Sequence, residues 1–206
     1  MKTSMNRNAS QQEAVNTVKQ CGIVLLAAGK GERFIEAGGV GNKLLANYPN
    51  SQGKPVPLLS IALSQAVACG LPVRLVTRPD ENVIINLAQQ FSAAITLIES
   101  GGSGESIAAG VRDSCEWDGW LIAPADMGWL QSDDYLQVAA ALTHDDAQAR
   151  MVNADMPGHP VGFAKSYGSA LSQLTGDHGA RQLLDRTKLQ QLVGHRGVIK
   201  DADLPV

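Results

Sequence analysis

Glycines and basic side chains alternate in one short segment near the start of the chain. Gly29 and Gly31 precede Arg33, and Lys43 follows that arginine by ten positions. Backbone N–H groups beside glycine can face a ligand, and a guanidinium and an ammonium add positive charge. Such groups form a cradle for a polyphosphate. The pattern predicts a nucleoside triphosphate site. The alternative interpretation is a glycine-rich turn that only permits close packing.

The elements around this segment follow an alternating pattern. Residues 23–28 form an apolar run bounded by glycine, which predicts a buried strand ending at the loop. Further patterns predict strands over 73–77, 95–98 and 120–123, and helices over 58–68, 81–90, about 107–114 and 132–142. We therefore expect an α/β, three-layer, Rossmann-like fold, with helices on both faces of a mostly parallel central sheet.

Composition limits the class of protein. A length of 206 residues with 44% hydrophobic content suits one domain, and a net charge of −3 argues against a general nucleic-acid surface. No window approaches the roughly 18 apolar residues of a membrane span. The polar residues 1–20 lack the apolar core of a signal peptide, so we interpret them as a lead-in to a domain over 21–206. Cys21, Cys69 and Cys115 include no C-x-x-C pair, which favours buried reduced thiols in a cytoplasmic protein.

Two common phosphate-binding motifs do not fit the loop. A Walker A motif requires Ser or Thr after the lysine, but Leu44 follows Lys43. A dinucleotide fingerprint requires a third glycine, and here Phe34 occupies that part of the loop. Residues 26–33, LAAGKGER, instead fit the L-A-[AG]-G-x-x-x-R…K pattern of nucleotidyltransferases that activate sugars, alditols and molybdopterin.

Three further segments narrow the resemblance. GGSGESI at 101–107, PGHPV at 157–161 and GDHGAR at 176–181 occur in the order found in the molybdenum cofactor cytidylyltransferase family. The chain resembles this family, within the superfamily that includes molybdopterin guanylyltransferase, over nearly its whole length. The resemblance implies a nucleotidyltransferase fold. It also implies transfer of a cytidylyl group from CTP to the phosphate of molybdenum-loaded molybdopterin, which gives the cytosine dinucleotide and pyrophosphate.

The resemblance also assigns nucleotide-binding roles. Arg33 would hold the β- and γ-phosphates, and Lys43 would lie near the α-phosphate. Leu26, Ala27, Ala28, Gly29 and Gly31 would form the loop around the nucleotide. In this family Ala-Ala-Gly goes with cytidine and Ala-Gly-Gly with guanosine, so Ala28 favours CTP. Gly104 and Ser106 would line the base or ribose, although a helix cap explains that segment nearly as well.

Asp126 is the candidate metal ligand. It follows the predicted strand 120–123 at its carboxyl end, where open α/β sheets bind ligands. Mg²⁺ prefers a carboxylate there and takes its other ligands from substrate phosphates. By resemblance, Asp203 in the late D-x-D-x-P run is a second metal carboxylate. The alternatives are a turn-forming aspartate at 126 and a frayed chain end at 203.

The acceptor side is assigned by the same resemblance. Gly158, His159 and Pro160 would lie against molybdopterin, and His178 and Arg181 would contact its phosphate or its dithiolene-bound metal. Because proline and glycine cluster within residues 151–184, we interpret this range as an acceptor-side flap and place His159 in a loop. Molybdenum arrives with the substrate, so we expect no transition-metal site of the protein itself.

Other functions stay open at this level. The same chemistry with GTP, or with a sugar or alditol phosphate, is a close alternative. A non-catalytic molybdenum cofactor carrier is an alternative of another class, because the segment between Arg33 and Lys43 is longer than in the family. The expected partners are the small-molecule substrates and a molybdenum hydroxylase as recipient, with no nucleic acid and no membrane.

Overall fold

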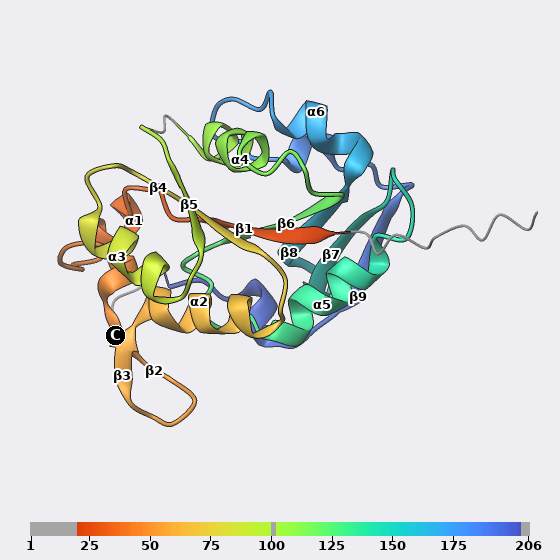
Figure 1. Cartoon of the computed structure of the whole chain (residues 1–206). Helices are drawn as coiled ribbons and strands as arrows, with labels where there is room; N and C mark the ends of the chain where they lie inside the picture. Colours follow the sequence, from red (N-terminus) through yellow and green to blue (C-terminus); the bar gives the residue numbers. More distant parts are fainter. Residues whose placement is uncertain (1–19, 100–101, 203–206) are drawn as a thin grey trace, which may run out of the picture.

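The central sheet has seven strands in the order β5-β4-β1-β6-β8-β7-β9 (Figure 1). The structure is a computed structural model, and it describes residues 20–99 and 102–202. β1, β4, β5 and β6 are parallel, β8 is antiparallel to both its neighbours, and β9 is parallel to β7. The strands are β1 (Cys21–Leu26), β4 (Val73–Thr77), β5 (Ala94–Leu97), β6 (Gly119–Pro124), β7 (Gln148–Asn153), β8 (Met156–Ala164) and β9 (Leu189–Val193).

Helices cover both faces of this sheet, as predicted. In Figure 1, α4 and α6 lie above the sheet, and α2, α3 and α5 lie below it. The helices are α1 (Glu32–Glu36), α2 (Leu58–Ala68), α3 (Asn82–Gln90), α4 (Ser103–Arg112), α5 (Ser132–Ala141) and α6 (Gly168–Leu171). The described residues also form 3-10 turns at η1 (Lys43–Leu45), η2 (Lys165–Tyr167), η3 (Arg181–Leu183) and η4 (Arg196–Ile199). None of the helices described here is long and apolar enough to span a membrane.

Alternation along the strands divides the core into two layers. Ile23 and Leu25 pack in the larger layer with α2 and α5, whereas Val24 packs in the smaller layer with α4. Successive strand residues point to opposite faces, so a strand buried on both sides reads as an unbroken apolar run. This explains why β1 and β6 were predictable from hydrophobicity. All three cysteines are described and none forms a disulfide; Cys21 is buried as predicted, but Cys115 is exposed.

The proposed flap is in large part central sheet. Residues 151–184 begin inside β7 and include all of β8, which lies between β6 and β7. The β7–β8 register shifts between Arg150 and Val152, so residues 158–160 bulge opposite Met151. Proline lacks an N–H donor and is tolerated in strands at such irregularities. His159 therefore lies in an irregular part of a strand and not in a loop. The sequence did not predict this strand because it contains prolines at 157 and 160.

A small hairpin was also missed. β2 (Asn47–Pro49) and β3 (Pro55–Pro57) pair antiparallel in a separate two-stranded sheet, which projects from the body at the bottom of Figure 1. Each strand has only three residues and contains proline, so neither gives a strand pattern in the sequence. The predicted lead-in lies outside the described residues, apart from Gln20.

Candidate functional site

A cleft of about 590 Å³ opens where β1 and β6 end, and this volume is typical of small-molecule sites. It brings together many of the residues that the sequence singled out. The predicted residues that line it are Leu26, Ala27, Ala28, Gly29, Gly31, Arg33, Lys43, Ser106 and Asp126. Lys30, which was not among the predicted residues, also lines the cleft.

The loop after β1 forms one wall of the cleft. Ala27 and Ala28 are buried, whereas Gly29 is exposed to the cleft. Gly31 has φ 64°, in the left-handed region that favours glycine, and α1 begins at the next residue. This conformation turns the chain so that Arg33, exposed on α1, also lines the cleft.

Lys43 reaches the same cleft despite the ten-residue separation from Arg33. It begins η1, where the Asn42 side chain accepts a hydrogen bond from the Leu44 N–H at 3.0 Å. Its stem lies beside the loop, because a Cβ on Gly31 would stand 3.7 Å from the Lys43 Cγ. The Lys43 ammonium forms an ion pair with the Asp126 carboxylate, and both side chains are less than one-fifth exposed. The longer intervening segment therefore does not remove this lysine from the cleft.

Asp126 follows β6 at the carboxyl end of the sheet. The Ala125 N–H donates to the Leu26 carbonyl at 2.9 Å, which fixes this turn against the end of β1. The Asp126 carboxylate lines the cleft beside the phosphate-binding loop, so the donor fits a hard cation that takes its other ligands from phosphates. Asp203 lies outside the described residues. Within residues 20–99 and 102–202, no three His, Cys, Asp or Glu side chains gather into a metal cluster.

The N-terminal part of α4 forms the opposite wall. Ser106 lines the cleft, and its hydroxyl donates to the Gly102 carbonyl at 3.1 Å. Gly104 faces the segment 175–177 instead, because its N–H donates to the Gly176 carbonyl at 2.8 Å and an added Cβ would lie 2.6 Å from the Thr175 carbonyl oxygen. Its lack of a side chain therefore has a packing reason, while its contact with a nucleotide stays a prediction.

Arg78 and Glu81, which we call the bracket, form a polar network between the phosphate-binding loop and the turn before Lys43. The sequence did not predict this network. Arg78 follows β4 and donates to the Ala28 carbonyl at 3.3 Å and to the Glu81 carboxylate. The same carboxylate accepts from the Asn42 side chain at 2.9 Å. Glu81 therefore links the phosphate-binding loop to the turn that presents Lys43. Arg78 comes directly after a predicted strand at the ligand-binding edge, and that position was the available signal.

Three of the residues assigned to the acceptor, Gly158, His159 and Pro160, lie on β8. Gly158 and Pro160 are buried and His159 is mostly buried. Burial lowers the pKa of His159 to about 4, and the nearby charge of Arg150 also lowers it. The ring therefore stays neutral near pH 7, with Nδ1 3.4 Å from the Ile122 carbonyl. The charge of the Asp126 carboxylate acts in the opposite direction and raises the pKa of His159, but burial outweighs it.

His178 and Arg181 lie on the segment that leads into η3. Both are exposed, and neither lines the cleft. The segment is tied to α4, because the Ser103 hydroxyl donates to the Asp177 carbonyl at 2.9 Å and the Glu105 carboxylate accepts from the Gly176 N–H at 2.8 Å. Asp177 itself lines the cleft.

A second cavity of about 760 Å³ lies on the α2 side of the molecule. It is lined by Tyr48 and Trp129, whose rings meet edge to face at 5.7 Å, and by Lys200, whose ammonium lies 3.8 Å from the Trp129 ring centre. None of the predicted site residues among those described lines this larger cavity. The smaller cleft is the candidate site because the loop, the cations and the carboxylate converge there.

Comparisons with known proteins identify a family and similar folds. Residues 23–192 match the family described as MobA-like NTP transferase domain. A search of curated proteins finds no match. Among solved structures, Rv0371c from Mycobacterium tuberculosis H37Rv is similar with a TM-score of 0.74 and 19% identity, over 91% of this chain and 94% of that one.

Two further structures share the fold. A nucleotidyl transferase from Methanothermobacter thermautotroptrophicus has a TM-score of 0.71 and 17% identity, over 86% of this chain and 88% of its own. A complex of the M. tuberculosis protein with manganese has a TM-score of 0.63 and 18% identity, over 92% of each chain. The expected nucleotidyltransferase fold is confirmed.

Proposed function

The chain belongs to the family of MobA-like NTP transferase domains, and on this basis we propose that it transfers the cytidylyl group of CTP to the phosphate of molybdenum-loaded molybdopterin. The observation that carries the proposal is the position of Lys43 and Asp126. Their side chains form an ion pair in the cleft, directly beside the glycine loop after β1. A cation and a carboxylate beside backbone donors match the needs of nucleotidyl transfer.

The chemistry assigns roles to these groups. An oxygen of the acceptor phosphate attacks the α-phosphorus of CTP and forms a new P–O bond, while the bond to the β-phosphate breaks and pyrophosphate leaves with its electron pair. Negative charge grows on the α-phosphoryl and leaving oxygens, so catalysis depends on positioning and on fixed positive charge. Lys43 stabilises the α-phosphoryl oxygens, and Arg33 stabilises the departing pyrophosphate.

Asp126 is the proposed protein ligand for a divalent cation, which we propose to be Mg²⁺. Before the nucleotide binds, the ion pair keeps the Asp126 carboxylate at the cleft. When CTP binds, Lys43 turns to the phosphates and leaves the carboxylate available to the cation. When bound, the cation would neutralise the charge on the phosphates. The manganese complex of the similar M. tuberculosis protein supports a divalent cation in this fold.

Two features support the finer assignment. Ala28 is buried in the loop, at the position where the resembling family has alanine with cytidine and glycine with guanosine. The segments around His159 and Arg181 match the motifs that this family places against molybdopterin, and a molybdenum hydroxylase is then the natural recipient of the product.

Pyrophosphate release tests this proposal. The protein is incubated with Mg²⁺ and molybdenum-loaded molybdopterin, and CTP, GTP and ATP are compared. Turnover with CTP alone is expected. Turnover with GTP would keep the mechanism and discard the Ala28 argument, whereas silence with all three despite tight pterin binding would favour a carrier.

A further inference from the structure

β9 is the last strand of the central sheet, and the described residues place no further strand on its outer edge. The Gly194 N–H donates to the Val152 carbonyl at 2.8 Å, which fixes how the main chain of β9 pairs with β7. In a parallel pair, every second residue directs both its N–H and its C=O to the same neighbouring strand. Leu192 therefore faces β7, whereas Gln191 and Val193 direct their main-chain groups to the open edge.

This edge lacks the features that normally keep sheet edges from pairing. Natural proteins protect an edge with charged side chains, proline or bulges, because open N–H and C=O groups pair readily with another chain. The strand sequence LQQLV contains no charge and no proline, and its register with β7 shows no bulge. Val193 is 83% exposed, although β-branched apolar residues favour paired strands. The outer edge of β9 is therefore an accessible and uninterrupted template for a further strand.

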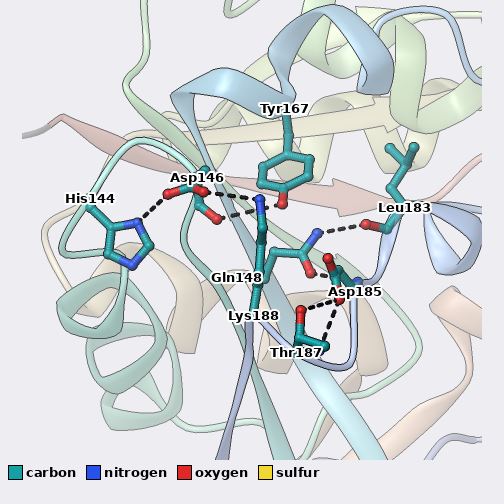
Figure 2. A network of polar contacts seen from close by, with 8 residues as sticks. All are labelled: His144, Asp146, Gln148, Tyr167, Leu183, Asp185, Thr187 and Lys188. Carbon is teal, nitrogen blue, oxygen red and sulfur yellow. Dashed lines mark hydrogen bonds and ion pairs between the residues drawn. The ribbon is translucent and has the colours of Figure 1, made fainter.

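The segment that leads into β9 is held by the body of the protein. Lys188 precedes the strand, and Figure 2 shows its ammonium directed to the Asp146 carboxylate, at 3.0 Å. In the same view the Gln148 side chain donates to the Leu183 carbonyl at 2.6 Å and accepts from the Asp185 N–H at 2.8 Å. The start of β9 is therefore fixed, and the positive charge beside it is compensated within the same chain.

We propose that β9 pairs antiparallel with β9 of a second copy of this chain, so that the two central sheets join. A two-fold axis brings the same strand to both sides of such an interface, so its sequence must be complementary to itself. A pairing centred on Gln191 sets this residue opposite its own copy and sets Leu189 opposite Val193. Amide then meets amide, apolar meets apolar, and no like charges lie opposite each other within the strand, as stable cross-strand pairs require.

A second copy suits this edge better than the start of the same chain. Residues 1–19 contain no aromatic residue and only two valines, so their sequence does not favour a strand. The nucleotide cleft opens where β1 and β6 end, and β8 and β7 lie between β6 and β9. The pairing is therefore independent of the proposed transfer reaction, and each can be tested without the other.

Sedimentation equilibrium of the full chain tests the pairing. One short strand pair makes a small interface, so we expect a reversible dimer. The average mass should rise from 21.7 kDa toward twice that value over a roughly 100-fold increase in protein concentration. By NMR, the Gln191 and Val193 amides should exchange with solvent more slowly as the dimer forms, and the Leu192 amide, which faces β7, is the internal control. A mass that stays at 21.7 kDa throughout would overturn the proposal.

Charge substitution at the two-fold axis tests the register. Gln191→Lys sets two lysines opposite each other and should abolish the dimer, and Gln191→Glu should do the same with two carboxylates. An equimolar mixture of the two variants should restore a dimer, because opposite charges then face each other. Gln191 is exposed, so both variants should fold, and thermal unfolding checks this.

The opposite edge of the sheet supplies the matched control. Leu97 is 53% exposed on β5, the edge strand at the other end of the sheet, so Leu97→Lys should leave the β9 dimer intact. A dimer that survives Gln191→Lys, that dissociates in Leu97→Lys, or that the mixture does not restore would place the contact elsewhere and overturn the proposal.

Discussion

Replacing Lys43 by alanine removes the cation that forms an ion pair with Asp126 in the cleft. Both partners are less than one-fifth exposed, so water cannot fully replace the lost ammonium. If Lys43 stabilises the charge that develops on the α-phosphoryl group, its loss should lower kcat by about 100- to 1,000-fold, as for other preorganised donors. Arginine should not restore the rate fully, since its planar fork differs from a compact ammonium.

The assay is steady-state pyrophosphate release with CTP and acceptor. Lys54→Ala is the matched control, because Lys54 is exposed beside the β2–β3 hairpin, lies outside the cleft and should leave kcat unchanged. Thermal unfolding of both variants excludes misfolding as the cause. A folded Lys43→Ala protein that keeps more than about one-tenth of the wild-type kcat would refute the role of this residue, since a group that stabilises the transition state contributes far more.

Three further predictions concern the loop, the bracket and the buried histidine. Gly31→Ala should lower the Tm by roughly 2–8 °C. The nearest atom to an added Cβ is 3.7 Å away, so the cost is not a clash but the left-handed backbone at φ 64°, which costs a residue with a Cβ about 1–2 kcal/mol. Gly29→Ala, whose Cβ meets no atom within 4 Å, is the control and should leave the Tm nearly unchanged. Glu81→Gln should lower kcat/KM for CTP roughly fivefold, since a charged acceptor of two hydrogen bonds becomes a neutral one; an unchanged value would show that the bracket does not position the site. The pKa of His159 is lowered to about 4 in the folded protein, so the unfolded chain binds the proton first as pH falls below about 6.5. The free energy of unfolding, measured without metal, should therefore drop by roughly 2 kcal/mol between pH 7 and pH 5. Urea unfolding of His159→Gln should lack this slope, and an identical slope in both proteins would contradict the assignment.

Local sequence patterns were sufficient to predict the glycine loop after β1 and the position of Asp126 at the edge of the sheet. The loop around Gly29 and Gly31 was predictable because a buried strand, a glycine turn and a basic helix follow each other directly in the sequence. Asp126 was predictable because parallel strands bring their carboxyl ends to one edge. Lys43 lines the cleft together with Arg33 although ten positions separate the two in the sequence, and its contact with the α-phosphate stays a prediction.

The missed features depend on contacts that are distant in sequence. Glu81 joins Asn42 across 39 positions, and no local pattern marks such a pair. Arg150 lies inside a strand, and its hydrogen bond to the Gly158 carbonyl depends on the bulge of β8. The prolines of β8 suggested a flap because proline normally interrupts a ladder, and only the neighbouring strands show how the sheet accommodates them.

Isotope transfer tests the central claim most directly. CTP labelled with ³²P at the α-position, and in a parallel reaction at the γ-position, is incubated with Mg²⁺, molybdenum-loaded molybdopterin and the protein. We expect the α-label in the pterin product and the γ-label in pyrophosphate, with both reactions lost in Lys43→Ala. Transfer of the γ-label to the pterin, or no transfer of either label, would contradict a nucleotidyl-transfer site in this cleft.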